Sequence, residues 1–502
     1  MSAIRSRPSQ VFSHIRHLSH IGPLPVARQS LRQALLSRLF VDPFATMASQ
    51  RVCAGKNVFV HGSLKSATVV VDAATGKITE VYDDVRDRGS FPDVEDANWI
   101  DAGDKYILPG LVDAHVHLNE PGRTDWEGFW TGTRAAASGG VTTVVDMPLN
   151  SIPPTTKVAN LEEKRAAAKG QCWTDVAFWG GVIPGNQAHL RPLIDAGVKG
   201  FKCFLIESGV DEFPCVNETD LRLAMDQLRD APTVLCFHAE LDKHSHPAPT
   251  ADPTEYNTFL TSRPQQLEVD AIALITTLQK QYPSLRLHIV HLSAASALPL
   301  IRAAKASGLP LTVETCFHYL CLNAEQIPAG RPEFKCCPPV REEGNRAALW
   351  DALLEGTIDC VVSDHSPCVA SLKRLEDGDI MKAWGGISTL GLGLSLLWTE
   401  GKKHGVGIER IVDWCAVKTA KHAGLAGRKG ALEVGYDADL VVWDPKEEFT
   451  VTRESLNFKN KLTPYEGLKL QGRVQKTYVR GQLVYDRAGG AFKGLQPVGQ
   501  LL

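Results

Sequence analysis

Two histidines separated by one residue, His115 and His117, have the spacing of a metal site. They end the mostly apolar stretch Ile107–His117, which has the composition of a β-strand. Alternate side chains on a strand share a face, so both imidazoles would project to the same side. Neutral imidazoles that converge in this way are good ligands for a divalent metal ion. A single His-x-His pair is more often two unrelated histidines, so the assignment depends on ligands from elsewhere in the chain.

Further candidate ligands stand at the ends of other predicted strands. His238 ends one apolar run, and His288 and His291 lie three residues apart in another. Residues three apart on a strand face opposite ways, so we choose His291, at the strand end, as the inward ligand and treat His288 as a packed or helix-facing histidine. Asp364 and His365 pose the same choice. We choose Asp364, because a carboxylate can both bind a metal and accept a proton.

Lys202 lies in the otherwise apolar run Gly200–Leu205. A buried ammonium is costly unless it is paired or neutralised. A desolvated lysine loses its proton more easily, and the free amine can react with carbon dioxide to form an anionic carbamate. The two carbamate oxygens could then bridge two metal ions. The alternative is a lysine at a strand end that reaches solvent.

The candidate ligands require a scaffold that brings several strand ends together. Apolar runs alternate with stretches of helical spacing, such as Leu267–Gln281 and Ala295–Ser307, which is the pattern of a parallel α/β sheet. Eight such units predict a TIM-like (β/α)8 barrel over residues 107–435, with its chemistry at the C-terminal strand ends. The eight runs are Ile107–His117, Thr142–Met147, Val176–Val182, Gly200–Leu205, Thr233–His238, Arg286–His291, Leu311–Thr315 and Ile358–Asp364.

Short β patterns flank the predicted barrel on both sides, over residues 47–106 and 436–490. Turn signals separate the patterns of the first segment, as in a small antiparallel sheet. Because a sheet needs several strands to be stable, we expect the two segments to pair into one composite β-sandwich domain.

Residues 1–46 differ from the rest of the chain, since they are rich in arginine and serine and contain no acidic residue before Asp42. This is the composition of an organelle transit peptide, so we expect mitochondrial targeting, with cytoplasm or peroxisome as the alternative. A disordered tail, or an upstream extension with Met47 as the usual start, would explain the same composition.

The overall composition is that of an ordinary globular protein of 502 residues. A net charge of −3 gives no reason to expect a nucleic acid or a membrane as partner. The 12 cysteines are scattered, which fits a reducing compartment better than a disulfide framework.

Several motifs of the chain are similar to those of a known family. The chain resembles the cyclic-amidohydrolase branch of the amidohydrolase superfamily, and within it the allantoinase family, from about Val52 to about Tyr485. The motifs that carry the resemblance are Gly110–His117 with its continuation Asn119–Thr124, Gly139–Val144, Gly200–Phe204, Val361–Cys368 and Met381–Gly386.

The resemblance implies a metal-dependent barrel flanked by a composite β domain. It also implies two divalent ions per chain, zinc first and other divalent metals as alternatives, about 4 Å apart. Their ligands would be His115, His117, Lys202 as N6-carboxylysine, His238, His291 and Asp364. The partners implied are a small-molecule substrate and further copies of the chain in a homo-oligomer, of which a tetramer is one form.

The activity implied is hydrolysis of the hydantoin-ring amide of (S)-allantoin to allantoate. A hydroxide bridging the two metals would attack the ring carbonyl, and Asp364 would carry the proton to the departing nitrogen. A hydantoinase or dihydropyrimidinase with the same machinery is the main alternative. A catalytically silent scaffold is a further one, although silent relatives typically lack metal ligands.

Other positions bear on the substrate. Asn119 stands where dihydroorotases of this branch have a carboxylate-binding arginine, which indicates an uncharged ring. Asn150 and Thr315, at two strand ends, are weaker candidates for orienting the ring, and strand-end capping explains them equally well. Cys337 departs from the expected pattern, because a serine is usual there.

Overall fold

The computed structural model describes residues 50–243 and 251–502, and residues 49–502 form one compact unit. The predicted targeting segment, residues 1–46, lies outside the described residues.

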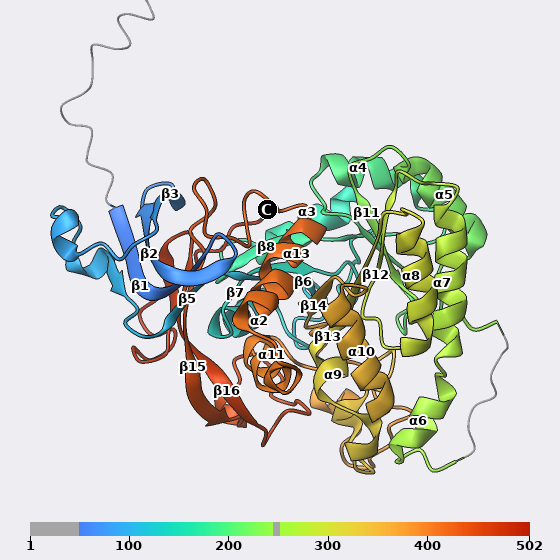
Figure 1. Ribbon diagram of the computed structural model, residues 1–502. Helices are drawn as coiled ribbons and strands as arrows, with labels where there is room; N and C mark the ends of the chain where they lie inside the picture. The colour runs from blue at the N-terminus through green and yellow to red at the C-terminus, as the bar shows by residue number, and fades with distance from the viewer. Residues whose placement is uncertain (1–49, 244–250) are drawn as a thin grey trace, which may run out of the picture. The chain divides into compact units, whose positions relative to one another are not determined.

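One mixed sheet of eight strands joins the two ends of the described chain (Figure 1). Its order is β17-β16-β15-β5-β1-β2-β3, and β4 pairs with β1. The sequence predicts a composite β-sandwich domain here, and the hydrogen bonds connect all eight strands into one continuous mixed sheet. The physical reason is β5, which pairs in parallel with β1 and antiparallel with β15 and so leaves no break between the two halves. The strands are β1 (Gln50–Val60), β2 (Ser63–Asp72), β3 (Lys77–Tyr82), β4 (Trp99–Asp101), β5 (Tyr106–Pro109), β15 (Leu440–Thr450), β16 (Lys469–Val479) and β17 (Gln482–Asp486).

The predicted strand Ile107–His117 is two strands in the structure. Its first part is β5 of the mixed sheet, and its second part begins the parallel strands. The chain crosses between them at Gly110, where a Cβ atom would collide with the side chain of Thr142. A glycine is therefore required at the crossing.

The parallel strands form two sheets, with orders β6-β7-β8 and β14-β13-β12-β11-β10-β9. The eight predicted runs correspond to these strands, with one run divided into β8 and β9 at Trp179. Regular pairing does not close them into one barrel, because β8 pairs with β7 while β9 pairs with β10. The strands are β6 (Leu111–Val116), β7 (Val141–Asp146), β8 (Asp175–Phe178), β9 (Gly180–Gly181), β10 (Phe201–Phe204), β11 (Val234–His238), β12 (Arg286–Ile289), β13 (Leu311–Cys316) and β14 (Cys360–Val362).

Hydrogen bonds nonetheless link the two parallel sheets at both of their edges. On one side the Lys199 amide, just before β10, donates to the carbonyl of Phe178 on β8 at 2.9 Å. On the other side Val116 forms a parallel bridge with His365, and the His117 amide donates to the His365 carbonyl at 2.8 Å. The strand ends that carry the candidate ligands are thereby held against one another.

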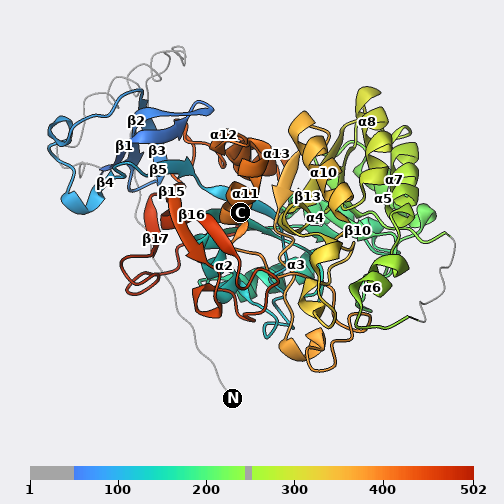
Figure 2. The same ribbon diagram turned by 60° about the horizontal axis from the view of Figure 1, so that its bottom comes forward.

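Helices cover the outside of the parallel strands, and Figures 1 and 2 both show α5, α7, α8 and α10 on the side away from the mixed sheet. The helices are α2 (Phe129–Ser138), α3 (Val158–Ala168), α4 (Leu190–Asp195), α5 (Glu218–Leu228), α6 (Tyr256–Ser262), α7 (Gln266–Gln279), α8 (Leu298–Ala306), α9 (Phe317–Cys321), α10 (Glu343–Glu355), α11 (Gly393–Gly401), α12 (Ile408–Val412) and α13 (Lys418–His422). Among the described residues, no helix is both long and apolar enough to cross a membrane.

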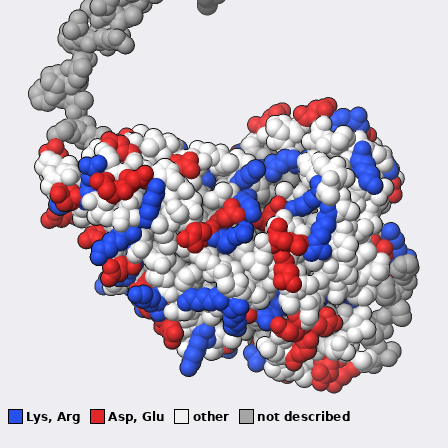
Figure 3. Space-filling view, viewed as in Figure 1, with Lys and Arg blue, Asp and Glu red and all other residues white. Residues whose placement is uncertain are grey.

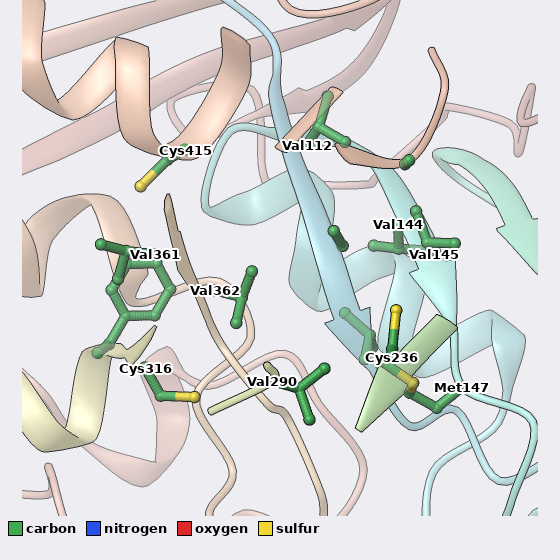
Figure 4. Close-up of a cluster of buried hydrophobic side chains, with 14 of the residues drawn as sticks. Val112, Val144, Val145, Met147, Cys236, Val290, Cys316, Val361, Val362 and Cys415 are labelled. Carbon is green, nitrogen blue, oxygen red and sulfur yellow. The ribbon is translucent and has the colours of Figure 1, made fainter. Parts of the chain in front are cut away.

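Small apolar side chains fill the space between the parallel strands. Figure 4 shows Val112, Val145, Cys236 and Val362, which come from β6, β7, β11 and β14, in one cluster. All four are buried. A filled interior leaves the strand ends as the place where polar groups can gather.

The surface carries both signs of charge. On the face of the described residues seen in Figure 3, acidic and basic side chains are interspersed. The mixture is in keeping with the small net charge of −3.

Candidate metal centre

A cavity of about 380 Å³ opens at the C-terminal ends of the parallel strands. The structure brings all six predicted metal ligands to this cavity from β6, β10, β11 and the loops that follow β12 and β14. They are His115, His117, Lys202, His238, His291 and Asp364.

His115, His117 and Asp364 form a close group, since their ligand atoms lie within 4.8 Å of one another. Oδ1 of Asp364 is 3.2 Å from Nε2 of His115 and 3.4 Å from Nε2 of His117. All three residues are buried. Asp364 has a φ of 41°, in the left-handed region that non-glycine residues rarely adopt, which turns its carboxylate toward the two imidazoles.

His238 and His291 complete the histidine set, with ring centroids 4.6 Å apart. His291 lies just beyond β12, where a φ of 41° turns it into the cavity. Its Nδ1 atom is buried and has no hydrogen-bond partner among the described residues. The ring of His115 lies 5.4 Å from the ring of His291, so the groups from β6 and β12 meet across the cavity.

Lys202 is 1% exposed on β10, and its ammonium nitrogen lies 5.2 Å from the centroid of the Phe204 ring. Burial lowers its pKa, against the opposing attraction of Asp364 and Glu314. The physical condition for a neutral amine, desolvation, is therefore present at this lysine.

The two histidines not chosen as ligands, His288 and His365, do not line the cavity. His288 is fully buried and hydrogen-bonds to Thr312 and Glu314. His365 accepts hydrogen bonds from the backbone amides of Thr389 and Leu390. His288 lies on β12 itself, whereas His291 lies beyond the strand and is turned into the cavity by its φ of 41°. The backbone turn at the strand end thus separates the ligand candidate from the packed histidine.

Two buried glutamates contact the imidazole rings of candidate ligands, and neither glutamate was predicted from the sequence. Glu314 on β13 contacts Nδ1 of His115 at 2.5 Å. Glu240 contacts Nε2 of His238 at 2.6 Å and is held by the guanidinium of Arg263. The available signal was a carboxylate inside the apolar run Leu311–Thr315, which is unfavourable without a partner.

The centre favours neutral imidazoles and an ionised carboxylate. Burial lowers the pKa of His117, His238 and, most strongly, His291. Burial alone would raise the pKa of Asp364, but the neighbouring His115 and His117 outweigh it and hold the value at about 2. These are the protonation states in which both residue types bind metals.

The predicted substrate residues are placed differently from one another. Asn150 lines the cavity, and its amide nitrogen is 3.4 Å from Nδ1 of His117. The Thr315 hydroxyl donates to the Leu292 carbonyl at 2.8 Å and does not line the cavity. Asn119 is 1% exposed with a φ of 63°, and Cys337 lines the cavity.

The donor set fits a divalent metal. Nε2 of His115 and Nδ1 of His291 are buried nitrogens without a hydrogen-bond partner among the described residues. Such orphaned atoms are unfavourable in a folded protein unless something binds them. Imidazole and carboxylate together suit zinc and other first-row divalent ions.

The sequence of this chain matches a model of a known protein family. The model described as the amidohydrolase family matches residues 106–484, which span all the parallel strands. The chain belongs to the amidohydrolase family. Members of this family are metal-dependent hydrolases, which agrees with the donor set at the cavity.

Relatives within the amidohydrolase family are closely similar. The allantoinase of Saccharomyces cerevisiae is 50% identical over 452 residues, which cover 89% of this chain and 97% of that protein. The mitochondrial allantoinase of Aquarana catesbeiana is 57% identical over 330 residues, 66% of this chain and 68% of that protein. Among solved structures, the L-hydantoinase (dihydropyrimidinase) of Arthrobacter aurescens has a TM-score of 0.81 at 30% identity, covering 90% of this chain and 98% of that one.

Proposed function

We propose that this amidohydrolase hydrolyses the hydantoin-ring amide of (S)-allantoin to give allantoate. The observation that carries the proposal is a complete candidate donor set in a chain 50% identical to an allantoinase over 97% of that protein. The complete set also weighs against a catalytically silent scaffold. Steady-state hydrolysis of allantoin by the purified protein, with metal content measured on the same sample, tests the proposal.

The proposed metal centre consists of two divalent ions, most simply zinc, held by the four histidines, by Asp364 and by Lys202 as a carbamate. When bound, the ions would acidify a water and polarise the ring carbonyl. Asp364 is ionised near neutral pH, because His115 and His117 hold its pKa at about 2. Its carboxylate can therefore accept the proton of the attacking water and deliver it to the departing ring nitrogen.

The remaining residues of the cavity position the ring. Asn150 presents an amide at the cavity wall, where it could donate to or accept from the ring. The cavity of about 380 Å³ also lies within the range of small-molecule sites, which accommodate a hydantoin ring with its side chain.

The catalytic scaffold is proposed to act as a single (β/α)8 barrel. The links at Phe178–Lys199 and at Val116–His365 support this, because they join the two parallel sheets at both edges. We also propose a homo-oligomer, which light scattering measures directly. We further propose mitochondrial targeting by residues 1–46, and the similarity to the mitochondrial allantoinase of Aquarana catesbeiana supports this proposal.

A hydantoinase or dihydropyrimidinase activity is the second candidate. It is favoured by the likeness to the L-hydantoinase of Arthrobacter aurescens at a TM-score of 0.81. A panel containing allantoin, substituted hydantoins and dihydrouracil separates the two. Preferred turnover of dihydrouracil or a hydantoin other than allantoin would favour the second candidate.

A further inference from the structure

The loop Met381–Gly386 forms part of the cavity wall and has no regular secondary structure. Two lysines donate hydrogen bonds to its backbone. Nζ of Lys335 donates to the carbonyls of Met381 and Ala383, both at 2.7 Å. Nζ of Lys373 donates to the carbonyls of Trp384, at 3.0 Å, and Gly386. Four of the six loop carbonyls are thus held by two side chains.

Neither lysine has the partner that a buried ammonium usually has. Lys335 is 7% exposed and Lys373 is 4% exposed, and within residues 50–243 and 251–502 neither forms an ion pair. Burial lowers the pKa of both groups. Burying an ammonium group without an ion-pair partner is unfavourable. Here the two ammonium groups donate hydrogen bonds to buried loop carbonyls, which need donors once they are removed from water.

A lysine suits this task because one nitrogen carries three donors that can serve several acceptors. A carbon chain of the same length would leave the loop carbonyls unsatisfied, and the loop would move to recover hydrogen bonds. The amides of the same loop are held too, since Trp384 donates to the Leu372 carbonyl and Gly386 donates to the Lys335 carbonyl.

The position of the loop affects the shape of the cavity, because the loop packs closely against residues around it. A Cβ atom on Gly386 would collide with the carbonyl of Ser366, two residues after Asp364. A Cβ atom on Gly385 would lie 3.0 Å from Sγ of Cys337. The ring of Trp384 packs edge-on against Trp126, with centroids 4.9 Å apart. A small shift of the loop would therefore change the shape of the cavity.

We propose that Lys335 and Lys373 are positioning residues, which hold the loop Met381–Gly386 as the wall of the substrate cavity and thereby set substrate binding rather than the chemical step. For the identity of the substrate the inference rests on the proposed function. The placement of the loop does not depend on it.

The test compares Lys373→Met and Lys335→Met with the wild type, and uses Lys403→Met as the control. Lys403 is a surface lysine with a 66% exposed side chain, paired with Glu400. For the Lys335→Met and Lys373→Met variants we expect KM for allantoin to rise about tenfold while kcat changes less than about threefold, because the binding that is lost is the same for the substrate and for the transition state. Metal content should stay equal to that of the wild type. Lys373→Arg, which keeps the charge and the donors, should recover part of the KM.

A second readout needs no substrate. Hydrogen exchange should become faster in peptides covering 381–386 of the lysine-to-methionine variants, and stay unchanged in peptides covering β6 and β11. An unchanged KM and an unchanged exchange rate in a folded variant would overturn the inference, and so would equal losses of kcat and metal. If the wild type does not act on allantoin, the proposed function fails, while the exchange measurement still decides whether the lysines hold the loop.

Discussion

Glu314 accepts a hydrogen bond from Nδ1 of His115, with 2.5 Å between the two atoms. Both side chains are buried, and burial alone would raise the pKa of Glu314, but its contacts with His115 and His288 outweigh this and hold the pKa well below its ordinary value. An ionised carboxylate can only accept, so the proton of the imidazole must sit on Nδ1. Nε2 is then left as a lone pair directed at the cavity, where a metal can bind it.

The first prediction tests this relationship. Glu314→Gln removes the charge that fixes the tautomer of His115, so we expect metal affinity to fall about 10- to 100-fold. Equilibrium dialysis against buffered zinc measures the affinity directly. Glu218→Gln, which removes a surface partner of Arg222, is the control and should bind metal as the wild type does. Unchanged zinc affinity in Glu314→Gln would show that His115 does not need this carboxylate.

The second prediction concerns Lys202. Lys202→Ala should lose metal and more than about 100-fold in activity, because a ligand of the ions is lost rather than a supporting group. A short carboxylate such as acetate or propionate should restore part of the activity by filling the gap. Intact-mass analysis of the wild type under carbon dioxide should show the carbamate. A fully active, metal-loaded protein with an unmodified Lys202 would contradict the assignment.

The third prediction concerns a buried charge cluster that joins β8 to the start of β15. Nζ of Lys429 is 2.5 Å from Asp175, 3.0 Å from Asp437 and 2.8 Å from Asp439. All four residues are buried. Lys429→Met leaves the carboxylates without their shared cation and should destabilise the fold by about 3–5 kcal/mol.

The pH dependence of this loss follows from Asp439, whose pKa burial raises while Lys429 opposes the rise. Without Lys429 the pKa of Asp439 should rise further. A raised carboxyl pKa means that the folded state binds the proton more readily than the unfolded state. The deficit of Lys429→Met is therefore largest above the folded pKa and shrinks as the pH falls through it. Urea unfolding at about pH 7.5 and about pH 5.5 measures the difference. A deficit that grows toward acid would refute this account.

The fourth prediction concerns Asn119 and the charge of the substrate. An uncharged side chain here should leave dihydroorotate a much poorer substrate than allantoin, since its carboxylate lacks a guanidinium partner. Because Asn119 is 1% exposed at a φ of 63°, Asn119→Arg should destabilise the fold, so the wild type is the proper test. Equal kcat/KM values for the two substrates would contradict the prediction.

The fifth prediction concerns residues 1–46. A chain that starts at Met47 should keep its kcat and KM, because all the candidate cavity residues lie far beyond that point in the sequence. A reporter fused to residues 1–46 should enter mitochondria. A diffuse cytosolic reporter would contradict targeting, and an inactive shortened enzyme would contradict dispensability.

Much of the fold could be predicted from the sequence, because strand-like runs and strand-end polar residues are local signals. The predicted runs at Thr233–His238 and Leu311–Thr315 correspond closely to β11 and β13. The division of Ile107–His117 at Gly110 could not be predicted, since it depends on Thr142 lying against the glycine. The single mixed sheet could not be predicted from the sequence either, because it depends on which distant strands pair with β5.

For the candidate site, the sequence alone determined which residues have the chemistry: the His-x-His pair, the lysine in an apolar run and the aspartate at a strand end. The sequence also favoured His291 over His288 and Asp364 over His365. In the structure, however, a φ of 41° at both His291 and Asp364, rather than strand alternation, directs these two side chains to the cavity. Only the tertiary structure decided what supports them. Glu314 contacts His115 across 199 residues of sequence, and Lys335 contacts its loop carbonyls across 46 and 48 residues. Contacts at such separations exist only once the chain has folded.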